Sequence, residues 1–316
     1  MHTSQVAIDR PARVPAGWRL VDALISIRRS GLGRGVRTAA PALLVAPALA
    51  LVGLLAAGIG FLAWASLHAY DTFLGLQGAF GFGQYSAIVH DRQFQTDLVR
   101  TVSMASVTAA IAVLLAIPFS LVMARSNRRW TRLALMVVIF VPYLTGDITR
   151  TFGWLAVLGP RGPLTWICER IGVTPPDVIG TLWAIGLGTV QVLLPAAVVI
   201  LLPAVLRLDT ELEHAARTLG ARPSRTFLHV ILPQLRIASF GALAACWALA
   251  MGDFADPQIL GQGLKDYLAN FLQNRYLAIG NPPQGAATGV ILIGLVTAGA
   301  GLILVLGRVR LRRRPL

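Results

Sequence analysis

The sequence predicts an all-α polytopic membrane protein with six transmembrane helices, and three observations support this fold class. Hydrophobic residues make up 55% of the 316 residues and charged residues only 13%, whereas soluble domains carry about 25% charged residues. Long apolar runs exceed the roughly 20 residues that a helix needs to cross a bilayer. Arginines cluster in alternate connecting segments, as expected for cytoplasmic loops.

Four of the apolar runs contain no charged residue, and each is predicted to form one span. Two further runs are interrupted by charges, which are Asp147 and Arg150 in the third span and Asp253 and Asp256 in the fifth. We count both because six spans give a consistent topology. The predicted transmembrane domain covers residues 41–308, with spans at about 42–67, 99–124, 133–158, 179–206, 236–256 and 287–307.

The positive residues predict the orientation of the chain. Seven arginines precede the first span, four follow the second, five lie between residues 207 and 236, and five follow the last span. Because short cytoplasmic loops are enriched in Lys and Arg, both termini are predicted to be cytoplasmic, as tails of residues 1–40 and 309–316. This orientation also explains the net charge of +14. We therefore expect membrane lipid, and no nucleic acid, as a contact of the basic segments.

The long cytoplasmic loop at residues 207–236 reads as two short amphipathic helices. Thr210 and Glu213 have capping-box spacing at the start of the first helix. Its apolar face is formed by Leu212, Ala215, Ala216 and Leu219. Gly220 can end this helix in a left-handed turn, and a second helix is predicted from Ser224 to Pro233. Such an element presents an apolar stripe to a partner.

This loop resembles the EAA loop of binding-protein-dependent ABC import permeases. The family pattern is Glu-Ala-Ala, three residues, Gly, nine residues and Ile-x-Leu-Pro, and the matching residues are Ala215, Ala216, Gly220, Leu232 and Pro233. The register places His214 where the family carries its glutamate, and Glu213 lies one residue earlier. The resemblance implies that this loop is a coupling helix that docks on a separate ATPase subunit.

The resemblance extends from about Tyr85 onward and is strongest to the permease subunits of spermidine/putrescine importers, of the first of their two permease types. The residues that carry it are Arg150–Trp154, Leu194, Pro195, Gly252–Phe254, Pro257, Leu260, Gly261, Pro283 and Gly285–Ala287. It implies a type I importer (MetI-like) permease fold in a bacterial inner membrane. The implied partners are an ATPase dimer that uses ATP and Mg²⁺, a second homologous permease and an external solute-binding protein.

Charged residues within the predicted spans are candidates for the translocation path, because each costs about 2.5–3.5 kcal/mol near the bilayer centre on insertion scales. These candidates are Asp147, Arg150, Asp253 and Asp256, and we add the aromatic side chains of Trp154 and Phe254. Acidic groups would attract polyamine ammonium groups, and the rings would add cation–π contacts. An alternative for Asp147 and Arg150, which lie at i and i+3, is that they only neutralise one another.

Residue types that the sequence lacks exclude several other functions. The only lysine, Lys265, is followed by Asp266 and has no P-loop spacing, so we expect no ATPase activity of this chain itself. The two cysteines and five scattered histidines predict no metal site, and no cofactor is expected. Importers of ferric iron, thiamine or phosphonate remain alternatives, as does a secondary transporter, although no inverted repeat is visible.

Overall fold

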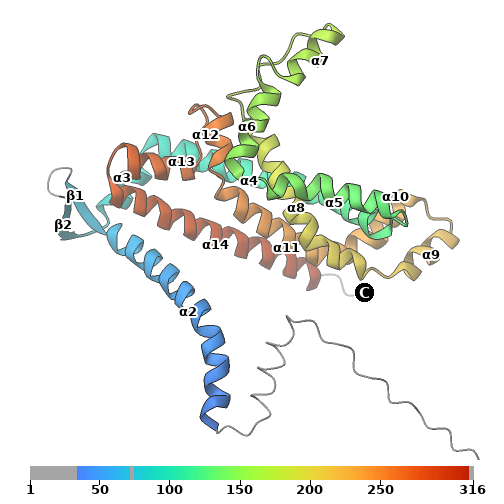
Figure 1. Cartoon of the computed structure of the whole chain (residues 1–316), viewed down its shortest axis with the longest axis horizontal. Coiled ribbons are helices and arrows are strands. Elements are labelled where there is room, and N and C mark those ends of the chain that lie inside the picture. The colour runs from blue at the N-terminus through green and yellow to red at the C-terminus, as the bar shows by residue number, and fades with distance from the viewer. Residues whose placement is uncertain (1–33, 72–74, 313–316) are drawn as a thin grey trace, which may run out of the picture. The chain divides into compact units, whose positions relative to one another are not determined.

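Helices form nearly all of the regular structure in the computed structural model, which describes residues 34–71 and 75–312 (Figure 1). The chain divides into two units, residues 1–61 and 62–316, and each is described by itself. Helix α2 (Arg34–Ala65) contains the described part of the first unit and ends in the second. Its segment Val45–Ala65 is long and apolar enough to cross a membrane. This is the first predicted span.

Four long helices pack together in the second unit (Figure 1). They are α4 (Arg92–Arg125), α8 (Leu182–Leu206), α11 (Leu232–Met251) and α14 (Pro282–Arg312). Helix α4 lies against α8 and α11, and α11 also lies against α14. The core between them is rich in small buried side chains, including Ala105, Ala109, Ala112, Ala116, Ala197 and Ala242. Small residues let membrane helices approach closely, so van der Waals packing holds the bundle together.

The third predicted span is not one continuous helix. It consists of α5 (Arg129–Leu144) and a second helical segment that begins with α6 (Asp147–Leu158), and the two are bent by 108°. Pro142 removes a backbone donor from the last turn of α5, and Thr145 then adopts an extended conformation with ψ of 136°. The chain therefore leaves the helix just before Asp147, so its charge lies at a helix start instead of within a helix.

The fifth predicted span also ends earlier than expected. Helix α11 ends at Met251, and the chain turns into the short helix α12 (Ala255–Leu260). Asp253 and Asp256 consequently lie beyond the long helix, whereas the predicted span at 236–256 placed both aspartates inside it. Glycine at position 252 ends the helix, with its backbone N–H donating to the carbonyls of the preceding turn.

The loop between α8 and α11 contains helices α9 (Thr210–Thr218) and α10 (Pro223–Thr226). Asp209 caps α9 by accepting from the N–H of Glu211, so the predicted cap at Thr210 is one residue late. Helix α10 does not end at Pro233, because it continues through the π-helical turn η1 (Phe227–Ile231) into α11. Pro233 lies in the first turn of α11, directly after η1, so the N–H that proline lacks falls where the π-helical turn gives way to the α-helix.

Shorter elements complete the fold. Strands β1 (His68–Asp71) and β2 (Gly75–Phe80) form an antiparallel hairpin, with His68 opposite Phe80, which the sequence pattern did not predict. The remaining helical segments are α3 (Gly83–Val89), α7 (Pro163–Ile171), α13 (Leu268–Gln273) and the π-helical turn η2 (Asn274–Ala278). Among the described residues, five helices could each cross a membrane, and the bent pair could make a sixth span. The all-α polytopic fold class is confirmed.

Candidate functional site

The turn between α9 and α10 has the geometry that the sequence predicts. Gly220 has a φ of 78°, in the left-handed region that favours glycine. Its N–H donates to the carbonyl of Arg217, and the N–H of Ala221 donates to the carbonyl of Ala216, both at 3.0 Å. These two bonds close the last turn of α9 in the manner of a Schellman motif. The angle between the two short helices therefore depends on this glycine.

The predicted docking surface of this loop is exposed. The side chains of Leu212 and Leu219 are 51% and 87% exposed, and His214 and Ala215 also face solvent. Ala216 is half-buried, and at the far end of the motif Leu232 is half-buried while Pro233 is exposed. The short helix α9 therefore exposes two large apolar side chains.

Glu213 points away from this exposed surface. It is only 5% exposed and forms an ion pair with Arg125, the last residue of α4, through Oε1 and Nη2. His214 is thus the outward residue at the position where the family pattern carries glutamate. The sequence could not predict the inward orientation of Glu213, because its partner lies 88 positions away in the chain.

A cavity of about 720 Å³ lies where α6, α8 and the end of α11 meet. Four of the six candidate path residues line it, namely Asp147, Arg150, Asp253 and Phe254. Trp154 and Asp256 do not. The indole Nε1 of Trp154 instead donates to Oε1 of Gln191 on α8. The cavity therefore brings together residues from the two interrupted spans, in which the charged residues lie at helix ends.

Asp147 and Arg150 form the ion pair that their spacing allows, with 2.9 Å between Oδ1 and Nη1. The pair is asymmetric, because the Asp147 side chain is 72% exposed and the Arg150 side chain is 7% exposed. Asp147 thus keeps most of its surface open to the cavity while one of its oxygens accepts from Arg150. A buried guanidinium that retains one carboxylate partner is less costly than an isolated buried charge.

The two aspartates beyond α11 have different surroundings. Asp253 accepts from the hydroxyl of Thr189 at 2.7 Å and lines the cavity. Asp256 is fully buried and accepts from the hydroxyl of Thr151 at 2.6 Å. Asp256 therefore joins α12 to α6 inside the protein, whereas Asp253 lines the cavity.

Gly188 makes the position of Asp256 possible. A Cβ atom at Gly188 would lie 2.8 Å from the carboxylate carbon and both carboxylate oxygens of Asp256. Neither this glycine nor the two threonines that donate to the aspartates stood out in the sequence. Single small residues in apolar helices are common, so only the packed structure distinguishes these three from the rest.

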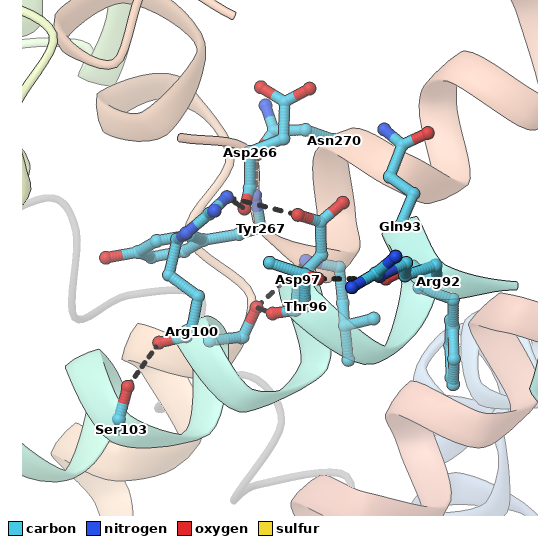
Figure 2. Close-up of polar contacts among 12 residues, drawn as sticks. Arg92, Gln93, Thr96, Asp97, Arg100, Ser103, Asp266, Tyr267 and Asn270 are labelled. Carbon is cyan, nitrogen blue, oxygen red and sulfur yellow. Dashed lines mark hydrogen bonds and ion pairs between the residues drawn. The ribbon is translucent and has the colours of Figure 1, made fainter. Parts of the chain in front are cut away.

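A second polar cluster lies at the opposite end of α4 from Arg125 (Figure 2). Arg100 Nη1 donates to Oδ1 of Asp97 at 3.1 Å and to the backbone oxygen of Asp266 at 2.8 Å. Asn270 anchors the neighbouring segment by donating to the backbone oxygen of Phe254 at 3.1 Å. Burial raises the pKa of the Tyr267 phenol well above its usual range, so its hydroxyl keeps its proton.

Comparison with known proteins gives a consistent result. The model of the binding-protein-dependent transport system inner membrane component family matches residues 116–314. The chain is 31% identical over 210 residues to the spermidine/putrescine permease protein PotB of Haemophilus influenzae, covering 65% of this chain and 71% of the relative. It is 28% identical over 255 residues to the inner membrane ABC transporter permease protein YdcU of Escherichia coli, covering 75% and 80%.

The fold has also been seen in solved structures. A chain of the bacterial alginate ABC transporter, in complex with a periplasmic protein that binds an alginate pentasaccharide, superimposes with a TM-score of 0.68. That match covers 95% of this chain and 99% of the other, at 13% sequence identity, so it supports the fold alone. The family match covers most of the described helices, including the loop at residues 207–236, here called the docking loop, and the cavity. The chain therefore belongs to the family of binding-protein-dependent transport system inner membrane components.

Proposed function

We propose that this permease subunit forms half of the passage of an ATP-driven importer for polyamines such as spermidine and putrescine. The observation that carries the substrate class is the cavity of about 720 Å³, which Asp147 and Asp253 line from opposite interrupted spans. The PotB relatives, which are named for spermidine and putrescine, support the same class. Phosphonate, an anion, would be repelled by these carboxylates, which argues against one of the alternatives.

Asp253 is the residue through which the cavity would contact an ammonium group. One carboxylate oxygen accepts from Thr189, and the other accepts only a long bond, of 3.4 Å, from the N–H of Asp256. Phe254 lines the same cavity and offers a ring for a cation–π contact. Trp154 has no such role in this arrangement, because its indole contacts Gln191. Asp256 has a structural role instead, because it joins α12 to α6 by accepting from Thr151.

The docking loop is proposed to bind the ATPase subunit through Leu212, His214, Ala215 and Leu219. Their exposure at the end of the bundle that carries Arg125 and Glu213 supports this role. ATP and Mg²⁺ would act on the ATPase dimer, and a second homologous permease would complete the passage. In the proposed orientation this loop and both chain ends are cytoplasmic, and a solute-binding protein docks at the other end of α4.

The substitution Asp253→Asn tests the proposed path. It keeps an acceptor for Thr189 but removes the charge, and we expect polyamine uptake at subsaturating concentration to fall about tenfold, equivalent to about 1.4 kcal/mol of lost attraction. Assembly with the ATPase, measured by co-purification, should not change. Asp177→Asn, which neutralises an exposed carboxylate outside the cavity, is the matched control. Unchanged uptake by the Asp253 variant would refute the proposed path.

The substrate class is tested by ATPase activity of the complete importer in lipid discs. Spermidine or putrescine on the binding protein should stimulate hydrolysis, whereas ferric iron, thiamine or phosphonate should not. Stimulation by one of the other solutes alone would keep the importer and discard the polyamine. Failure of any ATPase to co-purify with intact chain would contradict the docking role and favour a secondary transporter.

A further inference from the structure

A second cavity, of about 390 Å³, lies at the end of α4 that is remote from the docking loop. It is lined by the first turns of α4 and by the segment from Gly263 to Asp266. Arg125, which holds the docking loop, lies at the other end of this 34-residue helix. A helix of that length spans about 50 Å, so this outer cavity and the docking loop lie at opposite ends of the bundle.

Two carboxylate oxygens at the outer cavity lack a hydrogen-bond partner among the described residues. They are Oδ2 of Asp97 and Oδ1 of Asp266, both buried. Asp97 is only 3% exposed, and its other oxygen accepts from Arg100. In Figure 2 the carboxylate of Asp97 projects from α4 toward the segment that carries Asp266. An unpaired buried acceptor costs about 1–3 kcal/mol, and more when charged, so a donor is expected to occupy this place.

The chemistry of the lining narrows the kind of donor. Both unpaired atoms are carboxylate oxygens, which accept and cannot donate, so an anion would be repelled. Among the described residues no group of three or more His, Cys, Asp or Glu side chains could hold a metal ion, and the guanidinium of Arg100 occupies one of the four carboxylate oxygens here. A primary ammonium carries one positive charge and three donors on a narrow stem, which suits two acceptors at one cavity.

The size of the cavity also favours a ligand larger than one water molecule. Its volume of about 390 Å³ compares with roughly 30 Å³ for a water in the liquid. The side chains of Arg92 and Gln93 are exposed and line the same cavity. Because exposed side chains of this length change rotamer readily, they can move aside and let an alkyl stem reach Asp97.

We infer that the outer cavity is a binding site for an alkylammonium group, with Asp97 as its main acceptor and Asp266 as the second carboxylate. The ammonium comes either from a free amine or from a lysine side chain of the docked solute-binding protein. The site consists of the two unpaired carboxylate oxygens of Asp97 and Asp266. It is therefore independent of which solute the importer carries.

The experiment uses the complete importer in lipid discs and n-butylamine as the probe, detected by saturation-transfer NMR. To exclude the cavity at Asp253, the complex carries Asp253→Asn. Butylamine should bind and butan-1-ol should not, beyond its partition into lipid. Asp97→Asn and Asp266→Asn should each weaken binding about tenfold or more, as expected for the loss of a charge-assisted bond. Asp177→Asn, at an exposed site away from this cavity, should not change it.

A second arm identifies a lysine as the source. The affinity of the binding protein for the importer is measured before and after acetylation of its lysines. If butylamine does not bind, but Asp97→Asn and Asp266→Asn each weaken docking about tenfold and acetylation removes the difference, the ammonium belongs to the binding protein.

The site is refuted if neither butylamine binding nor docking of the binding protein depends on these aspartates. It is also refuted if Asp177→Asn has the same effect. Asp266→Asn keeps the test valid if Asp97→Asn does not fold, because Oδ1 of Asp266 makes no hydrogen bond within the described part of the chain.

Discussion

At the scale of the residue, the two interrupted spans are joined by one hydroxyl–carboxylate pair, Thr151 with Asp256, which depends on the glycine at position 188. Asp256 can accept from Thr151 only because residue 188 has no side chain. The pairing of Asp147 with Arg150 was foreseeable, because i and i+3 spacing places both on one face. The pairing of Glu213 with Arg125 was not, because a sequence pattern carries no information about partners that only the fold brings together.

We predict that Gly188→Ala destabilises the protein by about 1–3 kcal/mol, the usual cost of overpacking. The added carbon would lie 2.8 Å from the Asp256 carboxylate, which must then shift away from Thr151. The midpoint of thermal unfolding in detergent measures the effect. Gly153→Ala is the matched control, because nothing lies within 4 Å of the added carbon there. Equal midpoints for both variants would show that Asp256 does not need this space.

At the scale of the element, the docking loop combines one predicted turn with one contact that the pattern did not reveal. The left-handed Gly220 ends α9 as its sequence context indicates. The prediction ended the second helix at Pro233, but α10 continues through the π-helical turn η1 into α11, and Pro233 directly follows that turn. Motif spacing thus located the loop correctly but not the course of its second helix.

Gly220→Val should uncouple transport from ATP hydrolysis while leaving membrane insertion intact. A side chain in the left-handed region costs about 1–2 kcal/mol, so the angle between α9 and α10 should change. The measurement is solute transported per ATP hydrolysed in proteoliposomes. Gly220→Asn, which tolerates this conformation better, should retain more of the coupling. Normal coupling in the valine variant would contradict the role of the turn.

The ion pair between Arg125 and Glu213 should transmit the movement of the docking loop to α4. Glu213→Gln removes one charge from an ion pair that is worth about 1 kcal/mol, because solvent screens the Arg125 side chain, which is 38% exposed. We expect ATPase stimulation by the loaded binding protein to decrease while basal hydrolysis is retained. The exchange Arg125→Glu with Glu213→Arg restores the pairing and should recover part of the stimulation. If each single variant behaves as the wild type does, the pair has no part in coupling.

At the scale of the whole molecule, composition and the lengths of apolar runs predicted the fold class and most of the apolar helices, five of which could each cross a membrane among the described residues. These signals succeed because the bilayer imposes one length and one composition on every spanning helix. They could not locate the bend of 108° between α5 and the segment that begins with α6, because charged residues within an apolar run do not show whether the helix continues through them. The hairpin of β1 and β2 was missed for a related reason, because four- and six-residue strands have too few alternations to detect.

The proposed orientation places the two cysteines in different environments. Cys168 on α7 should react with a membrane-impermeant maleimide added to spheroplasts, because it is partly exposed on the predicted outer side. Cys246 should stay unmodified, because it is buried in the bundle core. Labelling is read by mass spectrometry, and Cys168→Ser should abolish it. Modification of Cys168 only after permeabilisation would reverse the proposed orientation.

The bend at Asp147 has a consequence for how the protein is made. The residues that accept hydrogen bonds from the side chains of α6 lie later in the chain. Gln191 accepts from Trp154, and Asp256 accepts from Thr151. While the ribosome is still synthesising α8 and α12, the charges of Asp147 and Arg150 make insertion of this segment into lipid alone unfavourable in free energy. We therefore expect this segment to be the last to settle in the membrane, with biogenesis depending on an insertion machinery that shelters it until its partners emerge.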